Sequence, residues 1–400
     1  MEDINLITPD AQPKKRKSEI LIAVVITAVI SVFVTLAVVV FFVFGSNRFL
    51  KLRELEFYVN NYFYGESDPD AVTDGAMAGY ISALGDRFSH YFNSEDTDKR
   101  GDELQGNGKG VGIIVTRHPD TGNIYVDKVY DNCPAQKAGV REGDQITAVD
   151  GKLVTEVGYS QSVDDIIREI GSTVTFTLLR GSQTLQLEVT YDEFPAQSVF
   201  YEMIEGDIGY IDITTFNAET VPQFKNAVNA LITDGATALI FDLRGNGGGT
   251  VDSVTEMVDF LAPEGIIMTA KYAGGKEKTI ATSDAEEVDL PMAVLTDSAT
   301  ASASELFCAS IKDFGKGVSV GSTTFGKGVM QSTYYMSDGS SAVLTVAEFF
   351  PHSGKSFNGK GIAPDIEITL SEEQLKYFYQ LNTDEDTVIQ TAVKYFRNEK

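Results

Sequence analysis

An apolar run near the amino terminus constrains this chain more than any other feature. Residues 20–44 read ILIAVVITAVISVFVTLAVVVFFVF, and none of these 25 residues carries a charge. With a rise of about 1.5 Å per residue, a helix of this length crosses a hydrocarbon core of about 30 Å. A cleaved signal peptide is the alternative, but the length of the run and the lack of a small-x-small pattern before GSNRF favour an uncleaved anchor. We therefore predict a transmembrane anchor over residues 20–44, preceded by a polar cytoplasmic tail, residues 1–19.

Basic residues flank the anchor on both sides. The run KKRK, residues 14–17, precedes it, and Arg48, Lys51 and Arg53 follow it. The positive-inside rule narrowly favours a cytoplasmic amino terminus. The prediction is a single-pass protein of the cell membrane whose remaining residues lie outside the cytoplasm.

Charge and cysteine content exclude several classes of partner. The 400-residue chain has 58 acidic and 32 basic side chains and a net charge of −26, which repels nucleic acid phosphates. Cys133 and Cys308 are too few for a disulfide framework, and the three histidines show no short-spaced ligand pattern. We predict no nucleic acid partner, no metal and no cofactor.

The rest of the chain divides by its hydrophobic pattern. Residues 46–104 predict a small helical region, with two helices broken at Gly65 to Pro69 and a flexible link, GDELQGNGKG, at its end. Residues 105–192 predict a small barrel of strands with short helices, one of them over SVDDIIREI. Residues 193–370 alternate strand and helix, and residues 371–400 form a helical tail. Such alternation predicts an α/β domain with a mainly parallel sheet, whose ligands bind at the carboxyl ends of the strands.

Two loops of this last domain carry candidate chemistry. In TASASELF, Ser302 starts an amphipathic helix, and Glu305 completes a capping box with it. In GSTTFGKGVMQ, the spacing of Gly321, Gly326 and Lys327 is that of a phosphate-binding loop. That loop needs Ser or Thr after its lysine and a following helix, whereas here a glycine follows and VMQSTYYM is typical of a strand.

A serine and a lysine together suggest nucleophilic catalysis. The Ser302 hydroxyl is a weak nucleophile until a base removes its proton, and a lysine whose charge is disfavoured by burial, here Lys327, can act as that base. The amides of GNGGG and of Ala303 can stabilise an oxyanion, although the glycines also suit a plain tight turn. His352 leaves a Ser-His-Asp triad open, without further support.

These motifs resemble those of the carboxyl-terminal processing peptidases, which are tail-specific serine proteases with a PDZ domain. The resemblance rests on DLRGNGGG, SASE within TASASELF, KDFGKG and TFGKGVMQ. It implies that Ser302 is the nucleophile, Lys327 the general base and Gln331 the residue that orients the lysine. It also suggests Gly248 and Ala303 as the oxyanion donors.

The resemblance extends to both predicted domains. Residues 105–192 resemble the family's PDZ domain, with KGVGIIV as the carboxylate-binding loop and PAQKAGVREGDQITAVDG as the most recognisable run. Val111, Gly112 and Ile113 are then expected to hold the free carboxyl terminus of a peptide. The catalytic domain is expected to share the crotonase/ClpP-like fold.

The resulting prediction is a membrane-anchored serine endopeptidase that recognises protein substrates by their C-terminal tails and forms an acyl-enzyme. A PDZ scaffold on a catalytically silent domain is the alternative. The sequence leaves open whether the PDZ domain inhibits the enzyme or delivers substrates. It also leaves open whether the helical region near the anchor forms a homodimer or packs on its own domain.

Overall fold

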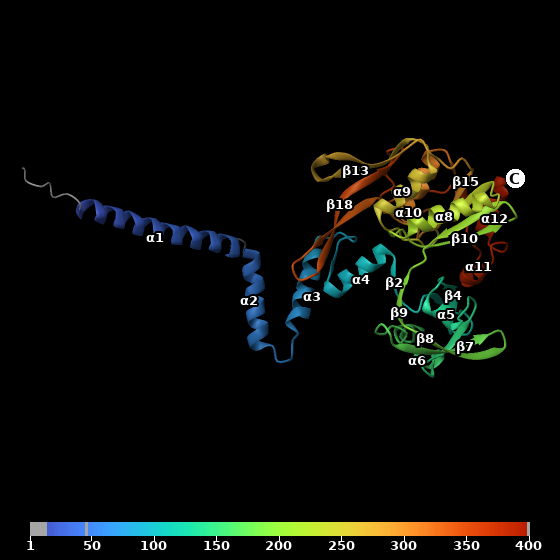
Figure 1. Cartoon of the computed structure of the whole chain (residues 1–400), viewed down its shortest axis with the longest axis horizontal. Coiled ribbons are helices and arrows are strands. Elements are labelled where there is room, and N and C mark those ends of the chain that lie inside the picture. Colours follow the sequence, from blue (N-terminus) through green and yellow to red (C-terminus); the bar gives the residue numbers. More distant parts are fainter. Residues whose placement is uncertain (1–13, 45–46, 398–400) are drawn as a thin grey trace, which may run out of the picture. The chain divides into compact units, whose positions relative to one another are not determined.

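The structure is a computed structural model that describes residues 14–44 and 47–397 and divides into two compact units, residues 1–73 and 74–400. The first unit is helical and contains α1 (Lys14–Phe44), α2 (Asn47–Tyr62) and the start of α3 (Pro69–Ser82). Helix α1 is long and continuous (Figure 1). Its stretch Ser18–Val38 has a mean hydropathy of 2.9 and no buried residue, as suits a membrane anchor or a signal sequence. Residues 1–13 of the predicted tail lie outside the described residues.

The two helices predicted before the barrel are confirmed as α2 and α3, but the predicted link GDELQGNGKG is wrong in its first half. Residues of that link belong to α4 (Ser94–Gln105), which follows the short strand β1 (His90–Phe92). The Asn93 side chain caps the start of α4, and Gly106 ends it with a φ of 81°. Helix α4 therefore continues through Gly101 and stops at Gly106, because Gly106 adopts the left-handed conformation that ends helices.

A six-stranded antiparallel sheet forms the region predicted as a small barrel, in the order β3-β4-β5-β7-β8 with β6 beside β5. Among the described strands β3 and β8 do not pair with each other, so the sheet is open; the region is still called the barrel below. A two-stranded sheet of β2 and β9 flanks it. The elements of this region are β2 (Asn107–Gly110), β3 (Ile113–Arg117), β4 (Ile124–Val129), α5 (Pro134–Ala138), β5 (Gln145–Val149), β6 (Lys152–Leu153), α6 (Val154–Val157), α7 (Tyr159–Asp164), β7 (Thr173–Arg180), β8 (Gln183–Thr190) and β9 (Asp192–Pro195).

The helix predicted over SVDDIIREI is only partly correct. Helix α7 begins earlier, at Tyr159, and ends at Asp164, so that the residues after it form turns. The Arg168 guanidinium folds back onto the Asp165 carbonyl at 2.8 Å, and Ile166 is buried in the barrel core. These two contacts replace the last turn of the expected helix.

The largest region contains the predicted mainly parallel sheet, in the order β10-β11-β12-β15-β16-β19, with only β10 antiparallel to its neighbour. Its elements are β10 (Val199–Ile204), β11 (Ile208–Ile213), α8 (Thr220–Thr233), β12 (Ala238–Asp242), α9 (Val251–Leu261), β15 (Met292–Thr296), α10 (Ala303–Asp313), β16 (Gly317–Gly321), β19 (Ile366–Glu367), α11 (Glu372–Lys376) and α12 (Thr387–Phe396). Figure 1 shows α8, α9 and α10 grouped near β10 and β15.

Both faces of this sheet are buried. One face packs against α8, α9 and α10 in a core that includes Phe224, Phe241 and Phe307. The opposite face packs against α12 through Ala392 and neighbouring apolar side chains. Burial on both sides explains why strand β12 is apolar over most of its length.

A second, antiparallel sheet was not predicted. It joins β1, β18 (Ser341–Pro351), β13 (Gly265–Tyr272) and β14 (Glu277–Ser283), with β17 (Val329–Tyr335) also paired to β18. Strand β1 pairs with β18 across some 250 residues of chain, from His90 opposite Val343 to Phe92 opposite Ser341. The segment before the barrel is thereby attached to the region that contains the candidate catalytic residues.

Candidate active site

The backbone turns sharply at Ser302, the residue immediately before α10. Its φ of 59° and ψ of −114° are rare for a residue with a side chain. Such strained positions concentrate at functional sites, because the surrounding structure must hold them in place. The predicted capping box between Ser302 and Glu305 is present.

The Glu305 carboxylate connects the turn at residues 301–303, here called the serine turn, to residues 324–327, here called the lysine loop. Glu305 is fully buried, and its Oε2 accepts the backbone N–H of Ser302 at 2.9 Å and that of Lys327 at 2.7 Å. Its Oε1 accepts the Gly326 N–H at 2.7 Å and the Thr324 hydroxyl at 2.5 Å. One buried carboxylate therefore places the backbones of the two predicted catalytic residues side by side.

The Lys327 amine lies in a partly apolar and cationic environment. Its Nζ is 5.0 Å from the centre of the Phe88 ring. Burial lowers the pKa of Lys327, and the Arg100 guanidinium lowers it further, while Asp86 acts in the opposite direction. Within the described residues, the amine makes no hydrogen bond to the Ser302 hydroxyl; catalytic hydrogen bonds often tighten only when substrate binds.

The two predicted oxyanion residues adjoin Ser302. A Cβ built on Gly248 would lie 2.9 Å from Ser302 Cβ and 3.0 Å from the Ala303 nitrogen. The Gly248 N–H donates to Asn246 Oδ1 at 2.8 Å. Among the described residues, the Ala303 N–H has no hydrogen-bond acceptor. The turn thus offers one unoccupied amide and a second amide held by the side chain of Asn246.

Gln331 lies near the start of β17, beside an irregularity in its pairing with β18. Its amide group donates to the Val329 carbonyl at 3.2 Å and contacts Thr345 Oγ1 at 3.5 Å. The structure records no bond from Gln331 to Lys327 in its described residues, so the orienting role stays a prediction.

The alternative sites receive no support from the geometry. His352 Nδ1 bonds to the Ile266 carbonyl at 2.9 Å, and its ring stacks on Phe314 with centres 4.2 Å apart. Strand β17, and not a helix, follows Lys327, as predicted. In the part of the chain that the structure describes, no group of three or more acidic, histidine or cysteine side chains is arranged to hold a metal.

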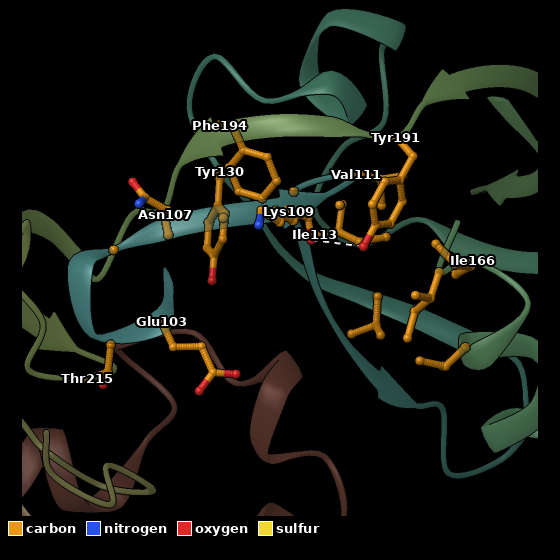
Figure 2. A pocket seen from close by; sticks show the side chains of 18 of the residues that line it. Glu103, Asn107, Lys109, Val111, Ile113, Tyr130, Ile166, Tyr191, Phe194 and Thr215 are labelled. Carbon is orange, nitrogen blue, oxygen red and sulfur yellow. Dashed lines mark hydrogen bonds between the residues drawn. The ribbon is translucent and has the colours of Figure 1, made fainter. Parts of the chain in front are cut away.

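A groove of about 540 Å³ runs along the predicted carboxylate-binding loop. Val111, Gly112 and Ile113 line it, and Ile166 lines it from the helical side. Figure 2 shows the side chains of Val111, Ile113 and Ile166 together with Tyr191, whose hydroxyl donates to the Lys109 carbonyl at 3.2 Å. The three residues predicted to bind peptide therefore share one apolar groove.

Sequence reasoning missed two parts of the site. The bridging role of Glu305 was hidden behind its local role in the capping box, although its place as the one charged residue in ATASASELFCASI was a signal. The placement of Phe88 and Arg100 beside Lys327 had no local signal, because it depends on the pairing of β1 with β18.

A strained serine, a half-buried lysine held on the same carboxylate and an apolar groove at residues 111–113 are the features expected of a PDZ-containing serine peptidase. Comparison with known proteins agrees. Residues 207–368 match peptidase family S41, and residues 108–191 match the PDZ domain family.

Individual proteins are also similar to this chain. The chain is 31% identical over 330 residues to the carboxy-terminal processing protease CtpA of Bacillus subtilis, covering 82% of this chain and 70% of that protein. It is 30% identical over 358 residues to a probable CtpA-like serine protease of Staphylococcus aureus, covering 89% of this chain and 72% of that protein. A putative S41 protease from Bacteroides fragilis has a similar fold, with a TM-score of 0.60, 20% identity and coverage of 85% of this chain and 92% of that chain.

The chain belongs to peptidase family S41, among the CtpA-like carboxy-terminal processing serine proteases.

Proposed function

We propose that this chain is a membrane-anchored endopeptidase that cleaves proteins recognised through their C-terminal tails. Residues 20–44 are proposed to hold it in the cell membrane, with the catalytic region outside the cytoplasm. Residues 105–192 would bind the tail, and residues 193–370, of crotonase/ClpP-like fold, would cleave the substrate. The family membership, the apolar helix α1 and the groove at Val111 to Ile113 support this assignment.

The proposed chemistry is acyl transfer through a Ser302–Lys327 dyad. The neutral Lys327 amine takes the hydroxyl proton as Ser302 Oγ attacks the scissile carbonyl. The Ala303 N–H stabilises the tetrahedral oxyanion, a contribution of about 3–4 kcal/mol for one donor in comparable sites. The Gly248 N–H becomes a second donor only when it exchanges its bond to Asn246 Oδ1 for the oxyanion. The lysine ammonium then protonates the leaving amine, which leaves an ester at Ser302. Lys327 next deprotonates a water that hydrolyses this ester.

One observation carries the dyad: Glu305 Oε2 accepts both the Ser302 and the Lys327 backbone N–H groups. Two residues 25 positions apart in the chain are thus held on one carboxylate oxygen. The pKa of Lys327 is lowered, first of all by burial. The amine therefore loses its proton more readily than an exposed lysine does, which also supports the dyad.

The test uses the full chain in detergent and an unfolded substrate with an apolar C-terminal tail. Ser302→Ala and Lys327→Ala are each expected to abolish cleavage while tail binding persists. Lys355→Ala, which changes an exposed lysine of the same region, serves as the matched control and should cleave normally. Cleavage by either dyad variant at the wild-type rate would refute the assignment.

A further inference from the structure

Two arginines from the segment before the barrel lie in the neighbourhood of Lys327. The Arg87 Cζ is 4.6 Å from the centre of the same Phe88 ring that Lys327 Nζ approaches to 5.0 Å. Arg87 Cζ is also 4.6 Å from the centre of the Phe325 ring, two residues before the lysine. The Cζ of Arg100, in α4, is 5.4 Å from the centre of the Phe92 ring in β1, and its charge helps to lower the pKa of Lys327. Three cationic side chains therefore converge where the reaction is proposed to occur.

Neither arginine has an acidic partner in the described residues. Other guanidiniums of the chain do pair: Arg180 with Asp144 at 2.7 Å and Arg244 with Asp242 at 2.5 Å. The Arg100 Nε is buried and has no hydrogen-bond acceptor in the described part of the chain. The Arg168 Nε also has no acceptor there, but that guanidinium pairs with Asp150 through its Nη2. The Arg100 guanidinium has no such carboxylate among the described residues, and because buried donors almost always find an acceptor, this difference indicates a missing partner.

The acids near Lys327 are already engaged. Asp86 Oδ2 accepts the Ser89 hydroxyl at 2.5 Å, and its Oδ1 accepts the Phe88 N–H at 3.2 Å. Glu305 is used by four donors of the serine turn and the lysine loop. In a chain with 26 more acidic than basic side chains, two arginines left without a carboxylate beside the proposed dyad are available to a ligand.

We propose that Arg87 and Arg100 form a subsite that binds a carboxylate of the substrate next to the Ser302–Lys327 dyad. The proposal rests on the proposed function of that site. A guanidinium fork is the side chain best matched to a carboxylate, and the partial burial of Arg100 strengthens such a bond, whereas Arg87 is exposed. The carboxylate is either an acidic side chain near the scissile bond or the free α-carboxylate at the end of the substrate.

Substrate pairs that differ only in one carboxylate test the proposal. One pair replaces a glutamate near the cleavage site by glutamine, and the other replaces the free C terminus by an amide. The full chain is expected to cleave the carboxylate form of at least one pair with a kcat/KM at least tenfold higher. In the double variant Arg87→Met, Arg100→Met, that ratio should fall to about one.

The double variant distinguishes the two sources of the carboxylate, because each source corresponds to one of the two kcat/KM ratios. Loss of the glutamate preference assigns the subsite to an acidic side chain, and loss of the free-terminus preference assigns it to the α-carboxylate. An amidation effect that persists in the double variant belongs to the PDZ groove and counts against the α-carboxylate. If both ratios match the wild type, or the wild type shows neither preference, the proposal is overturned.

Control variants separate binding from folding. Arg87 is exposed, so Arg87→Met should melt at the wild-type temperature and still lower the ratio at least threefold. Arg100→Lys keeps a charge and should retain part of the preference, whereas Arg117→Met, an exposed arginine of the barrel, should retain all of it. If Ser302→Ala abolishes cleavage but the ratios do not depend on the arginines, the subsite fails and the proposed dyad stands. Persistent cleavage in Ser302→Ala would instead refute the dyad.

Discussion

Replacing Glu305 by glutamine isolates the contact on which the site geometry depends. The carboxylate accepts four hydrogen bonds, two at each oxygen, and two of them come from the backbones of Ser302 and Lys327. Glutamine offers one acceptor oxygen, so two donors would face its NH₂ group. Bonds to a charged acceptor contribute about 1.5–3 kcal/mol each, and we expect the free energy of unfolding to fall by about 3–5 kcal/mol.

The same substitution should impair catalysis beyond its effect on stability. The serine turn and the lysine loop would separate, and a displacement of about 1 Å at a reacting group costs on the order of 100-fold in rate. Urea unfolding of the full chain and kcat/KM for a tailed peptide measure the two effects. The matched control is Glu256→Gln, which removes an exposed pair with Lys225 at 2.8 Å and should cost less than about 1 kcal/mol. A Glu305→Gln protein that is as stable and as active as this control would contradict the reasoning.

Three further predictions follow from individual residues. Gly248→Ala should lower kcat at least 100-fold, because its Cβ would lie 2.8 Å from the Ala301 oxygen and its φ is 105°. Gly247→Ala is the control: no atom lies within 4 Å of a Cβ at that position, so it should keep wild-type activity in the same assay. Burial raises the pKa of Asp127 to about 6, so its ionised form destabilises the folded state as the pH rises through 6. Asp127→Asn should therefore stabilise the protein by about 1–2 kcal/mol at pH 8 and by little at pH 4, as urea titrations at both values would show; equal effects at both would refute this. Burial raises the pKa of Cys308 to about 12, so iodoacetamide should label it only after unfolding, which mass spectrometry detects; rapid labelling of the native chain would contradict its burial.

The sequence allowed the parallel sheet and the serine turn to be predicted, because both depend on short-range patterns. Alternating apolar strands and amphipathic helices predicted a mainly parallel sheet, although not its strand order, and the i, i+3 spacing of Ser302 and Glu305 predicted the capping box. Within the antiparallel sheet, the pairing of β1 with β18 could not be predicted, because the two strands are distant in the chain and carry no turn signal between them.

The rest of the site required tertiary structure for the same reason. Glu305 is a helix-capping residue by sequence, and only the folded chain brings residues 324–327 to its free carboxylate oxygens. Phe88 reaches Lys327 across 239 positions. A charge such as that of Arg100 cannot be assigned to a site from composition, because its partners are set by packing.

The proposed mechanism depends most on Lys327 acting as a neutral base toward Ser302. The most direct measurement is the rate at which a serine-directed phosphonate modifies Ser302 as a function of pH, in the full chain and in Lys327→Met. The wild-type rate should rise with pH through an apparent pKa below the ordinary lysine value of 10.5, and the Lys327→Met protein should react at least 100-fold more slowly with no such rise. An unchanged rate and pH profile in Lys327→Met would contradict the account.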